Sequence, residues 1–218
     1  MSKEPREVQL GDWRLLVRDP EGRGPHPVIF LIHGWTGDER SMWVFASRLP
    51  KNALLLAPRA PYPSISDGYG GYSWVQQRSS SLSTVDDFYS GQTLFNDLLT
   101  ELPKIVKADY SKFSIIGFSQ GAAFSYAYAL NHPSTINKVA GLAGFLPEGC
   151  EDLAAGEPLM GKDVYIAHGS RDETVPVAHA REAKKVMALA GAEVRYCEDD
   201  IGHKLGAQCF TQLADFFA

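Results

Sequence analysis

The amino-acid sequence predicts a single α/β domain over residues 1–218, with a mostly parallel central sheet and helices on both faces. Three observations lead to this prediction. The chain has 218 residues, 44% of them apolar, which is enough for one substantial core. Continuous aliphatic runs recur along the chain, as in strands that are covered on both faces. Helical patterns separate most of these runs, and this alternation is typical of α/β domains.

The strands are expected in the following order. Residues 8–17 form two short segments around a Gly-Asp turn and predict an antiparallel hairpin at a sheet edge. Aliphatic runs then predict buried strands at residues 27–33, 53–57, 113–117, 138–142 and 164–168. The alternating segment 193–197 predicts the last strand, at the far edge. Helices are expected between these strands, and the predicted ranges are 39–49, 86–108, 120–131, 177–190 and 205–217.

Residues 58–84 show no periodicity and are rich in proline, glycine, serine and aromatic residues. A loop of this length in a compact domain is usually functional or disordered. Four aromatic residues within it favour a function, because a disordered segment has little reason to carry them. We therefore expect this segment to border the site. The sequence leaves open whether residues 61–84 close over a substrate.

Charge and cysteine content limit the possible functions. The net charge of -5 provides no basic surface for nucleic acid, and no apolar run reaches the roughly 18 residues of a membrane helix. Three cysteines without CxxC spacing predict reduced thiols rather than a disulfide framework or a zinc site. With a polar amino terminus, these features predict a cytoplasmic protein. The histidines and carboxylates are not clustered at ligand spacing, so no metal site is expected.

The motif Gly117-Phe-Ser-Gln-Gly121 is the clearest candidate for chemistry. It directly follows an expected buried strand and directly precedes an amphipathic helix, which is the setting of a nucleophile elbow. Such an elbow projects the serine hydroxyl above the sheet and places the amide groups of the helix amino terminus beneath the reacting carbon. Ser119 is therefore the predicted nucleophile. The alternative is that it only caps the helix.

A serine hydroxyl needs a base to take its proton, and the chain contains six histidines. His203 lies in a glycine-containing loop between the last strand and the carboxyl-terminal helix, and the order serine, acid, histidine favours it. His33 and His168 end strands and could also lie near the site. The other three have the context of surface or capping residues: His26, His132 and His179.

The acid is expected in the segment 169–176, which follows the strand 164–168 and contains both Asp172 and Glu173. A carboxylate at this point can accept the second ring proton of the histidine and stabilise the imidazolium. Asp172 is the predicted acid, and Glu173 is the alternative. The backbone N–H groups of Trp35 and Gln120 are the predicted oxyanion donors, because the loop after the first buried strand can converge with the elbow.

Taken together, these residues resemble the phospholipase/carboxylesterase branch of the α/β-hydrolase superfamily, which includes acyl-protein thioesterases. Five segments carry the resemblance: His33-Gly-Trp-Thr-Gly-Asp, Ala57-Pro-Arg-Ala-Pro, Gly117-Phe-Ser-Gln-Gly, His168-Gly-Ser-Arg-Asp-Glu-Thr-Val-Pro and Gly202-His203. The resemblance implies an α/β-hydrolase fold without a large lid domain and hydrolysis of acyl esters or thioesters without a cofactor. Trp74 is similar to a tryptophan that the family carries after its second core strand. The segment 64–71 and Lys204-Leu205 depart from the family pattern, so substrate preference does not carry over.

We therefore expect a serine hydrolase that cleaves carboxylic esters or thioesters through an acyl-enzyme on Ser119. The alternatives are an acyltransferase, a perhydrolase or a peptidase on the same scaffold, or a non-catalytic binding protein. The expected partner is a small-molecule acyl ester or thioester, and neither nucleic acid nor a membrane segment is involved. Acyl chain length, leaving group and oligomeric state are left open. Six apolar residues are the predicted pocket walls: Tyr69, Tyr72, Trp74, Phe145, Leu146 and Val175.

Overall fold

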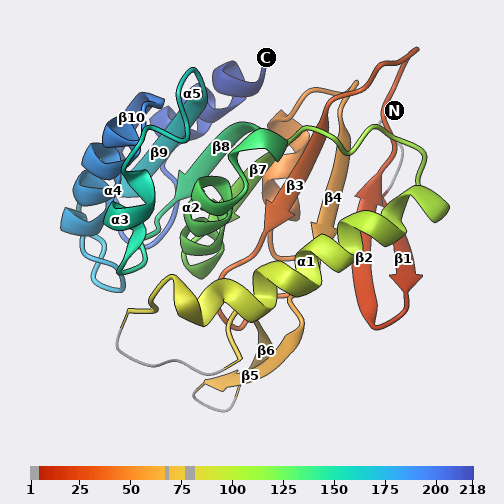
Figure 1. Ribbon diagram of the computed structural model, residues 1–218, viewed down its shortest axis with the longest axis horizontal. Helices are drawn as coiled ribbons and strands as arrows, with labels where there is room; N and C mark the ends of the chain where they lie inside the picture. The colour runs from red at the N-terminus through yellow and green to blue at the C-terminus, as the bar shows by residue number, and fades with distance from the viewer. Residues whose placement is uncertain (1–4, 67–68, 77–81) are drawn as a thin grey trace.

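The computed structural model describes residues 5–66, 69–76 and 82–218. An eight-stranded sheet lies at its centre, in the order β1-β2-β4-β3-β7-β8-β9-β10 (Figure 1). The six strands from β4 to β10 in this order are parallel, and the β1-β2 hairpin adds an antiparallel edge, as expected. The strands are β1 (Arg6–Leu10), β2 (Trp13–Arg18), β3 (Val28–Ile32), β4 (Leu54–Pro58), β7 (Phe113–Phe118), β8 (Ile136–Leu142), β9 (Asp163–Gly169) and β10 (Glu193–Asp199).

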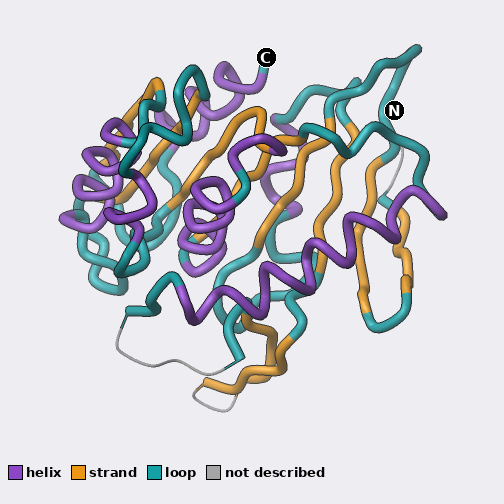
Figure 2. Tube along the Cα trace, viewed as in Figure 1, coloured by secondary structure: helices purple, strands orange, loops and turns teal. Residues whose placement is uncertain are grey.

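Helices cover the two faces of the sheet unequally (Figures 1 and 2). One apolar cluster joins the sheet to α1, α2, α3 and α4, and a second joins the opposite face to the 3₁₀ helix η1 and to α5. The second face therefore has less helical cover. The helices are α1 (Tyr89–Glu101), α2 (Gln120–Asn131), α3 (Cys150–Ala154), α4 (Ala178–Leu189) and α5 (Ala207–Phe217), with η1 (Trp43–Arg48), η2 (Asp86–Phe88), η3 (Leu102–Lys104) and η4 (Pro133–Thr135).

Two of the expected helices differ from the structure. Residues 39–49 form a turn followed by η1, in which backbone N–H groups donate three residues back rather than four, as Phe45 does to the Met42 carbonyl. The expected helix 86–108 is divided into η2, α1 and η3. Pro103 lies at the start of η3 and has no N–H to continue the α-helical ladder.

The segment 58–84 contains a hairpin that the sequence analysis treated as a loop. Strand β5 (Tyr62–Ser66) pairs antiparallel with β6 (Tyr69–Ser73). The Tyr72 N–H also donates to the Gly37 carbonyl at 2.9 Å, so the hairpin contacts the loop that follows β3. Gly71 has no room for a Cβ, which would overlap the Thr36 carbonyl. Gly70 and Gly71 interrupt the alternation of apolar and polar side chains by which a strand is predicted from sequence. Helix α3 was also not expected.

Cys197 and Cys209 form a disulfide that joins β10 to α5, whereas Cys150 is a buried free thiol. The expectation of three reduced thiols is therefore wrong for this pair. Sequence spacing could not show the bond, because it depends on α5 packing back against β10. The cytoplasmic prediction consequently loses the support that it took from the cysteines. In the part of the chain that the structure describes, every helix is too short or too polar to cross a bilayer.

Candidate active site

Ser119 lies on a tight turn between β7 and α2, as the sequence predicts. Its backbone has φ 53° and ψ -117°, a strained conformation for a residue other than glycine. The flanking glycines allow this turn, because three backbones approach closely there. A Cβ on Gly117 would overlap the Gly121 carbonyl, and a Cβ on Gly121 would overlap the Ile32 carbonyl. The two glycines of the motif are therefore required by packing between β3, β7 and α2.

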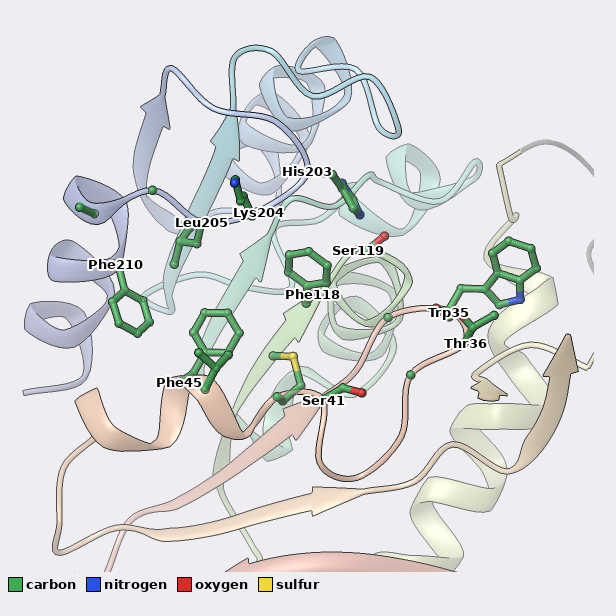
Figure 3. Close-up of a pocket in the computed structure, with 16 residues that line it drawn as sticks. Trp35, Thr36, Ser41, Phe45, Phe118, Ser119, His203, Lys204, Leu205 and Phe210 are labelled. Carbon is green, nitrogen blue, oxygen red and sulfur yellow. Dashed lines mark hydrogen bonds between the residues drawn. The ribbon is translucent and has the colours of Figure 1, made fainter. Parts of the chain in front are cut away.

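The Ser119 side chain is directed away from its own helix. It makes no capping hydrogen bond to α2, while its N–H donates to the Leu142 carbonyl at 2.8 Å. Figure 3 shows its hydroxyl oxygen directed toward the His203 ring, and both residues line the same cavity. Gln120 is the first residue of α2, so its amide lies at the positive end of the helix dipole. The hydroxyl is thus placed for attack on a bound carbonyl.

His203 and Asp172 are joined by a short hydrogen bond. The His203 Nδ1 lies 2.7 Å from the Asp172 Oδ2, and the aspartate side chain is fully buried. The second carboxylate oxygen, Oδ1, accepts the N–H groups of Thr174 and Val175, each at 2.9 Å. These bonds orient the carboxylate toward the imidazole. Glu173, the alternative acid, is exposed.

The turn that carries the acid and the loop that carries the histidine are tied to each other. The Ser170 N–H donates to the Asp199 carbonyl at 2.8 Å, and the Arg171 N–H donates to the Ile201 carbonyl at 3.0 Å. The disulfide closes the histidine loop between β10 and α5, and the Phe118 ring packs 5.0 Å from the His203 ring, centroid to centroid. His203 is therefore held from several sides, although 23% of its side chain stays exposed.

A buried group, which we call the brace, supports the loop after β3. It consists of His33, Ser73, Trp74 and Gln120. The Gln120 Oε1 accepts the Trp74 N–H at 3.1 Å, and its Nε2 donates to the Ser73 Oγ at 3.1 Å. The Trp74 indole N–H donates to the His33 carbonyl at 2.9 Å. The brace therefore links the residue after Ser119 to the loop that contains Trp35.

The His33 imidazole has a defined tautomer. Its Nε2 accepts the Ala60 N–H at 2.9 Å, and its Nδ1–H therefore donates to the Gly34 carbonyl at 2.7 Å. Burial lowers the pKa of His33 to about 4, so the ring is neutral at pH 7. Gly34 lies against the nucleophile, because an added Cβ would approach the Ser119 Cβ to 3.3 Å. His33 thus holds this backbone rather than acting as a base.

A cavity of about 580 Å³ opens beside Ser119 and His203. It runs past Phe118 toward the space between η1 and α5, on the face of the sheet with less helical cover (Figure 3). The rings of Phe45 and Phe210 lie 5.6 Å apart, centroid to centroid, at its far side. The remaining apolar walls come from the same elements and their flanking loops: Trp35, Met42, Val44, Leu205 and Ala207.

The predicted pocket walls lie elsewhere. Trp74 is fully buried in the brace, and the Tyr72 hydroxyl accepts a hydrogen bond from the Arg59 Nη1 at 3.0 Å. The other three residues with described side chains belong to the main apolar cluster: Phe145, Leu146 and Val175. These five are not among the residues that line the cavity. Tyr69 lies in β6, and its side chain is outside the described part of the structure.

Sequence reasoning missed the walls that η1 and α5 provide. Their aromatic residues fall in segments with helical periodicity, a pattern that indicates burial but not which buried side chains border a cavity. One group of possible metal ligands was found among the described residues, formed by Cys197, Asp199 and Cys209. Both sulfurs are bonded to each other in the disulfide, so this group has no thiolate to offer a metal.

Known proteins are similar to this chain over most of its length. The sequence profile of the phospholipase/carboxylesterase family matches residues 17–218. The chain is 29% identical over 177 residues to acyl-protein thioesterase 1 of Kluyveromyces lactis, covering 72% of this chain and 75% of the relative. It is 28% identical over 215 residues to acyl-protein thioesterase 1 of Eremothecium gossypii, covering 88% and 87%.

Solved structures show the same fold at lower sequence identity. The carboxylesterase of Bacillus cereus superposes with a TM-score of 0.81 at 22% identity, over 95% of this chain and 94% of that one. The carboxylesterase of Mesorhizobium loti gives a TM-score of 0.80 at 20% identity, over 98% of both chains. These likenesses show that the chain has the α/β-hydrolase fold.

Proposed function

Because the chain belongs to the phospholipase/carboxylesterase family and is a serine hydrolase of esters or thioesters, we propose that Ser119, His203 and Asp172 are its catalytic triad. The observation that carries this proposal is the placement of Ser119 and His203 in one cavity, with His203 bonded to Asp172 at 2.7 Å. The strained turn at Ser119 and the buried, oriented carboxylate support the same assignment.

The reaction proceeds in two steps. The His203 Nε2 takes the hydroxyl proton as Ser119 attacks the substrate carbonyl, and the same nitrogen returns the proton to the departing alcohol or thiol. Water then attacks the acyl-enzyme with His203 again as base, which releases the acid and restores the serine. Asp172 stabilises the imidazolium and keeps the ring in the tautomer that leaves Nε2 free to accept.

The oxyanion that forms in each step lies next to the amides of Gln120 and Trp35. Gln120 begins α2, and the Gly34-Trp35 backbone packs against Ser119. Donors in such positions stabilise the transition state by about 3 to 4 kcal/mol each. The brace holds both segments, since the Gln120 side chain and the Trp74 indole connect the elbow to the loop after β3.

The acyl chain of the substrate occupies the cavity between η1 and α5. This assignment is supported by the walls of the cavity, which are mostly hydrocarbon or aromatic, although Thr36, Ser41 and Lys204 also line it. Phe45 and Phe210 limit the length of chain that fits, and the Arg48 guanidinium packs 5.5 Å from the Phe210 ring centre. The substrate is thus a small-molecule ester or thioester with an apolar acyl group.

The nucleophile is tested with a Ser119→Ala variant. We expect it to fold, to escape labelling by a fluorophosphonate and to lose at least about 10⁴-fold in kcat toward p-nitrophenyl esters. The measurement is steady-state and burst kinetics, with intact mass of the labelled chain. Activity that survives in Ser119→Ala would move the assignment to another residue.

The acyl subsite is tested with esters from acetate to laurate on the native chain and on Phe210→Trp. We expect the variant to prefer shorter acyl chains, because the larger ring fills the far side of the cavity. A matched series of acetate esters with lengthening alcohols should respond less to the substitution. If the alcohol series responds instead, the cavity holds the leaving group and the acyl assignment is wrong.

A further inference from the structure

A second histidine, which does not line the cavity, lies beside the proposed catalytic acid. His168 lies near the end of β9, and its side chain is fully buried. Its Nε2 lies 2.8 Å from the Val175 carbonyl oxygen and 3.3 Å from the Asp172 Oδ2. The latter is the same carboxylate oxygen that bonds His203. The cavity is not lined by His168.

We propose that His168 is a positioning residue for the triad, which fixes the acid turn and places its imidazole beside the Asp172 Oδ2 that bonds His203. This proposal rests on the proposed function, because it assigns His168 a role that acts through Asp172. His168 touches neither substrate nor nucleophile. It sets the position of the Asp172 carboxylate and the strength of the electrostatic interaction between this carboxylate and His203.

The first part of the argument concerns the backbone of the acid turn. The Val175 N–H donates to the Asp172 Oδ1 at 2.9 Å, while the Val175 carbonyl accepts from the His168 Nε2–H at 2.8 Å. Val175 is therefore held through both of its backbone polar groups. Without the imidazole its carbonyl loses this buried partner, and the turn must move to expose it to water. Any such movement displaces Asp172, which the same turn carries.

The second part concerns the protonation state of His168. Its Nε2 carries the proton, since both neighbouring oxygens are acceptors. Its Nδ1 is buried and has no hydrogen-bond partner among the described residues, so a proton there would lie without an acceptor. Burial accordingly lowers the pKa of His168, and the charge of His203 lowers it further. The hydrogen bond to Val175 and the charges of Asp172 and Glu198 act in the opposite direction. His168 thus remains a neutral donor while His203 exchanges protons with substrate.

The third part concerns the charge on the shared oxygen. The Asp172 Oδ2 accepts the His203 Nδ1–H at 2.7 Å, and the His168 Nε2, whose proton is donated to the Val175 carbonyl, lies 3.3 Å from the same oxygen. Removal of the longer contact leaves His203 as the only imidazole on that oxygen. The His203 imidazolium then gains stabilisation from a less screened carboxylate. The acidic side of the pH profile should therefore move to higher pH.

Three variants of His168 separate these effects. His168→Gln can place an amide N–H where the imidazole Nε2–H lies, whereas the shorter His168→Asn cannot reach that position, and His168→Leu removes the polar group altogether. His132→Leu is the control, because it removes another imidazole, and partly buried His132 follows the opposite end of α2 from Ser119. Active sites are counted with a fluorophosphonate, so that kcat refers to labelled enzyme only.

We expect kcat per labelled site to fall roughly 10-fold to 100-fold in His168→Asn and His168→Leu, with KM within about twofold, because the acid is displaced. The pH of half-maximal kcat/KM on the acidic side should rise in His168→Asn and His168→Leu. In His168→Gln, kcat and this pH should return toward the native values. His132→Leu should match the native enzyme.

Two results would overturn the proposal. One is a native kcat and pH profile in His168→Asn, and the other is a His168→Gln variant that is as impaired as His168→Asn. If His168→Leu does not fold, the comparison of Gln with Asn still decides. A native chain that the fluorophosphonate does not label at Ser119 would instead refute the proposed function, which separates that failure from this one.

Discussion

Two aromatic regions border the site, and they differ in how their rings are held. In the brace, Trp74 is fully buried and its indole N–H donates to the His33 carbonyl at 2.9 Å. In the cavity, Phe45 and Phe210 contact each other at 5.6 Å between ring centres and border open space. In the first region the indole N–H has a buried hydrogen-bond partner, whereas the two phenyl rings of the second region have no polar atoms.

These two regions show that aromatic content alone does not indicate a binding pocket. The segment 58–84 has many aromatic residues, yet its Trp74 supports the backbone around Ser119 from within the core. The cavity instead lies where the sheet has less helical cover, between η1 and α5. One region thus holds the backbone beside Ser119 in place, and the other borders open space. This comparison can be tested by changing one ring in each region.

The largest effect is expected from Trp74→Ala. The substitution leaves a cavity in the core and removes the indole donor to His33, so the free energy of unfolding should fall by about 3 to 5 kcal/mol. Urea unfolding followed by circular dichroism measures this change. Activity should fall as well, since the loop beside Ser119 loses its support. A loss below about 1 kcal/mol would show that Trp74 does not hold the brace.

A smaller effect is expected from acid, through His33. Burial lowers the pKa of this residue from 6.5 to about 4, so between these values the unfolded chain binds a proton that the folded chain does not. Stability should therefore be lost as the pH falls from about 6.5 to about 4, by up to about 3 kcal/mol from this group. Urea unfolding at a series of pH values gives the slope.

His33→Gln serves as the comparison for this acid effect, because glutamine does not titrate. The variant should be less stable than the native chain at pH 7, but its stability should depend less on pH below 6.5. Equal slopes for the two chains would contradict the view that the brace requires a neutral imidazole at this position.

The smallest effect on stability is expected from Phe210→Ala, in the cavity region. Phe210 is only partly buried, so its truncation should lower the free energy of unfolding by about 1 kcal/mol. The same change should extend the range of acyl chains that the enzyme hydrolyses, because it enlarges the cavity beside Phe45. Urea unfolding and kcat/KM over an ester series measure the two consequences. A stability loss as large as that of Trp74→Ala would remove the distinction between the two regions.

Much of the fold was predictable because it depends on local patterns. The aliphatic runs at 27–33, 113–117 and 164–168 correspond to β3, β7 and β9, since a strand covered on both faces must be apolar throughout. The turn at Ser119 was predictable for a similar reason, because only glycine fits on either side of it. The helix expected at 39–49 is instead a turn and a 3₁₀ helix, because its backbone N–H groups donate three residues back, and apolar spacing does not distinguish this pattern from an α-helix.

The sequence by itself determined the α/β order, the elbow at Ser119 and the identity of Asp172 and His203 as candidates, because each follows from residues that are near in the chain. The tertiary structure alone decided the Cys197–Cys209 bond, the buried position of Trp74 and the place of the cavity. The disulfide depends on how α5 packs against β10, and the other two features depend on contacts between segments that are distant in sequence. The residue pattern of one segment shows that a side chain is buried. Only the packing of several segments shows whether that side chain lies in the core, forms a disulfide or borders a cavity.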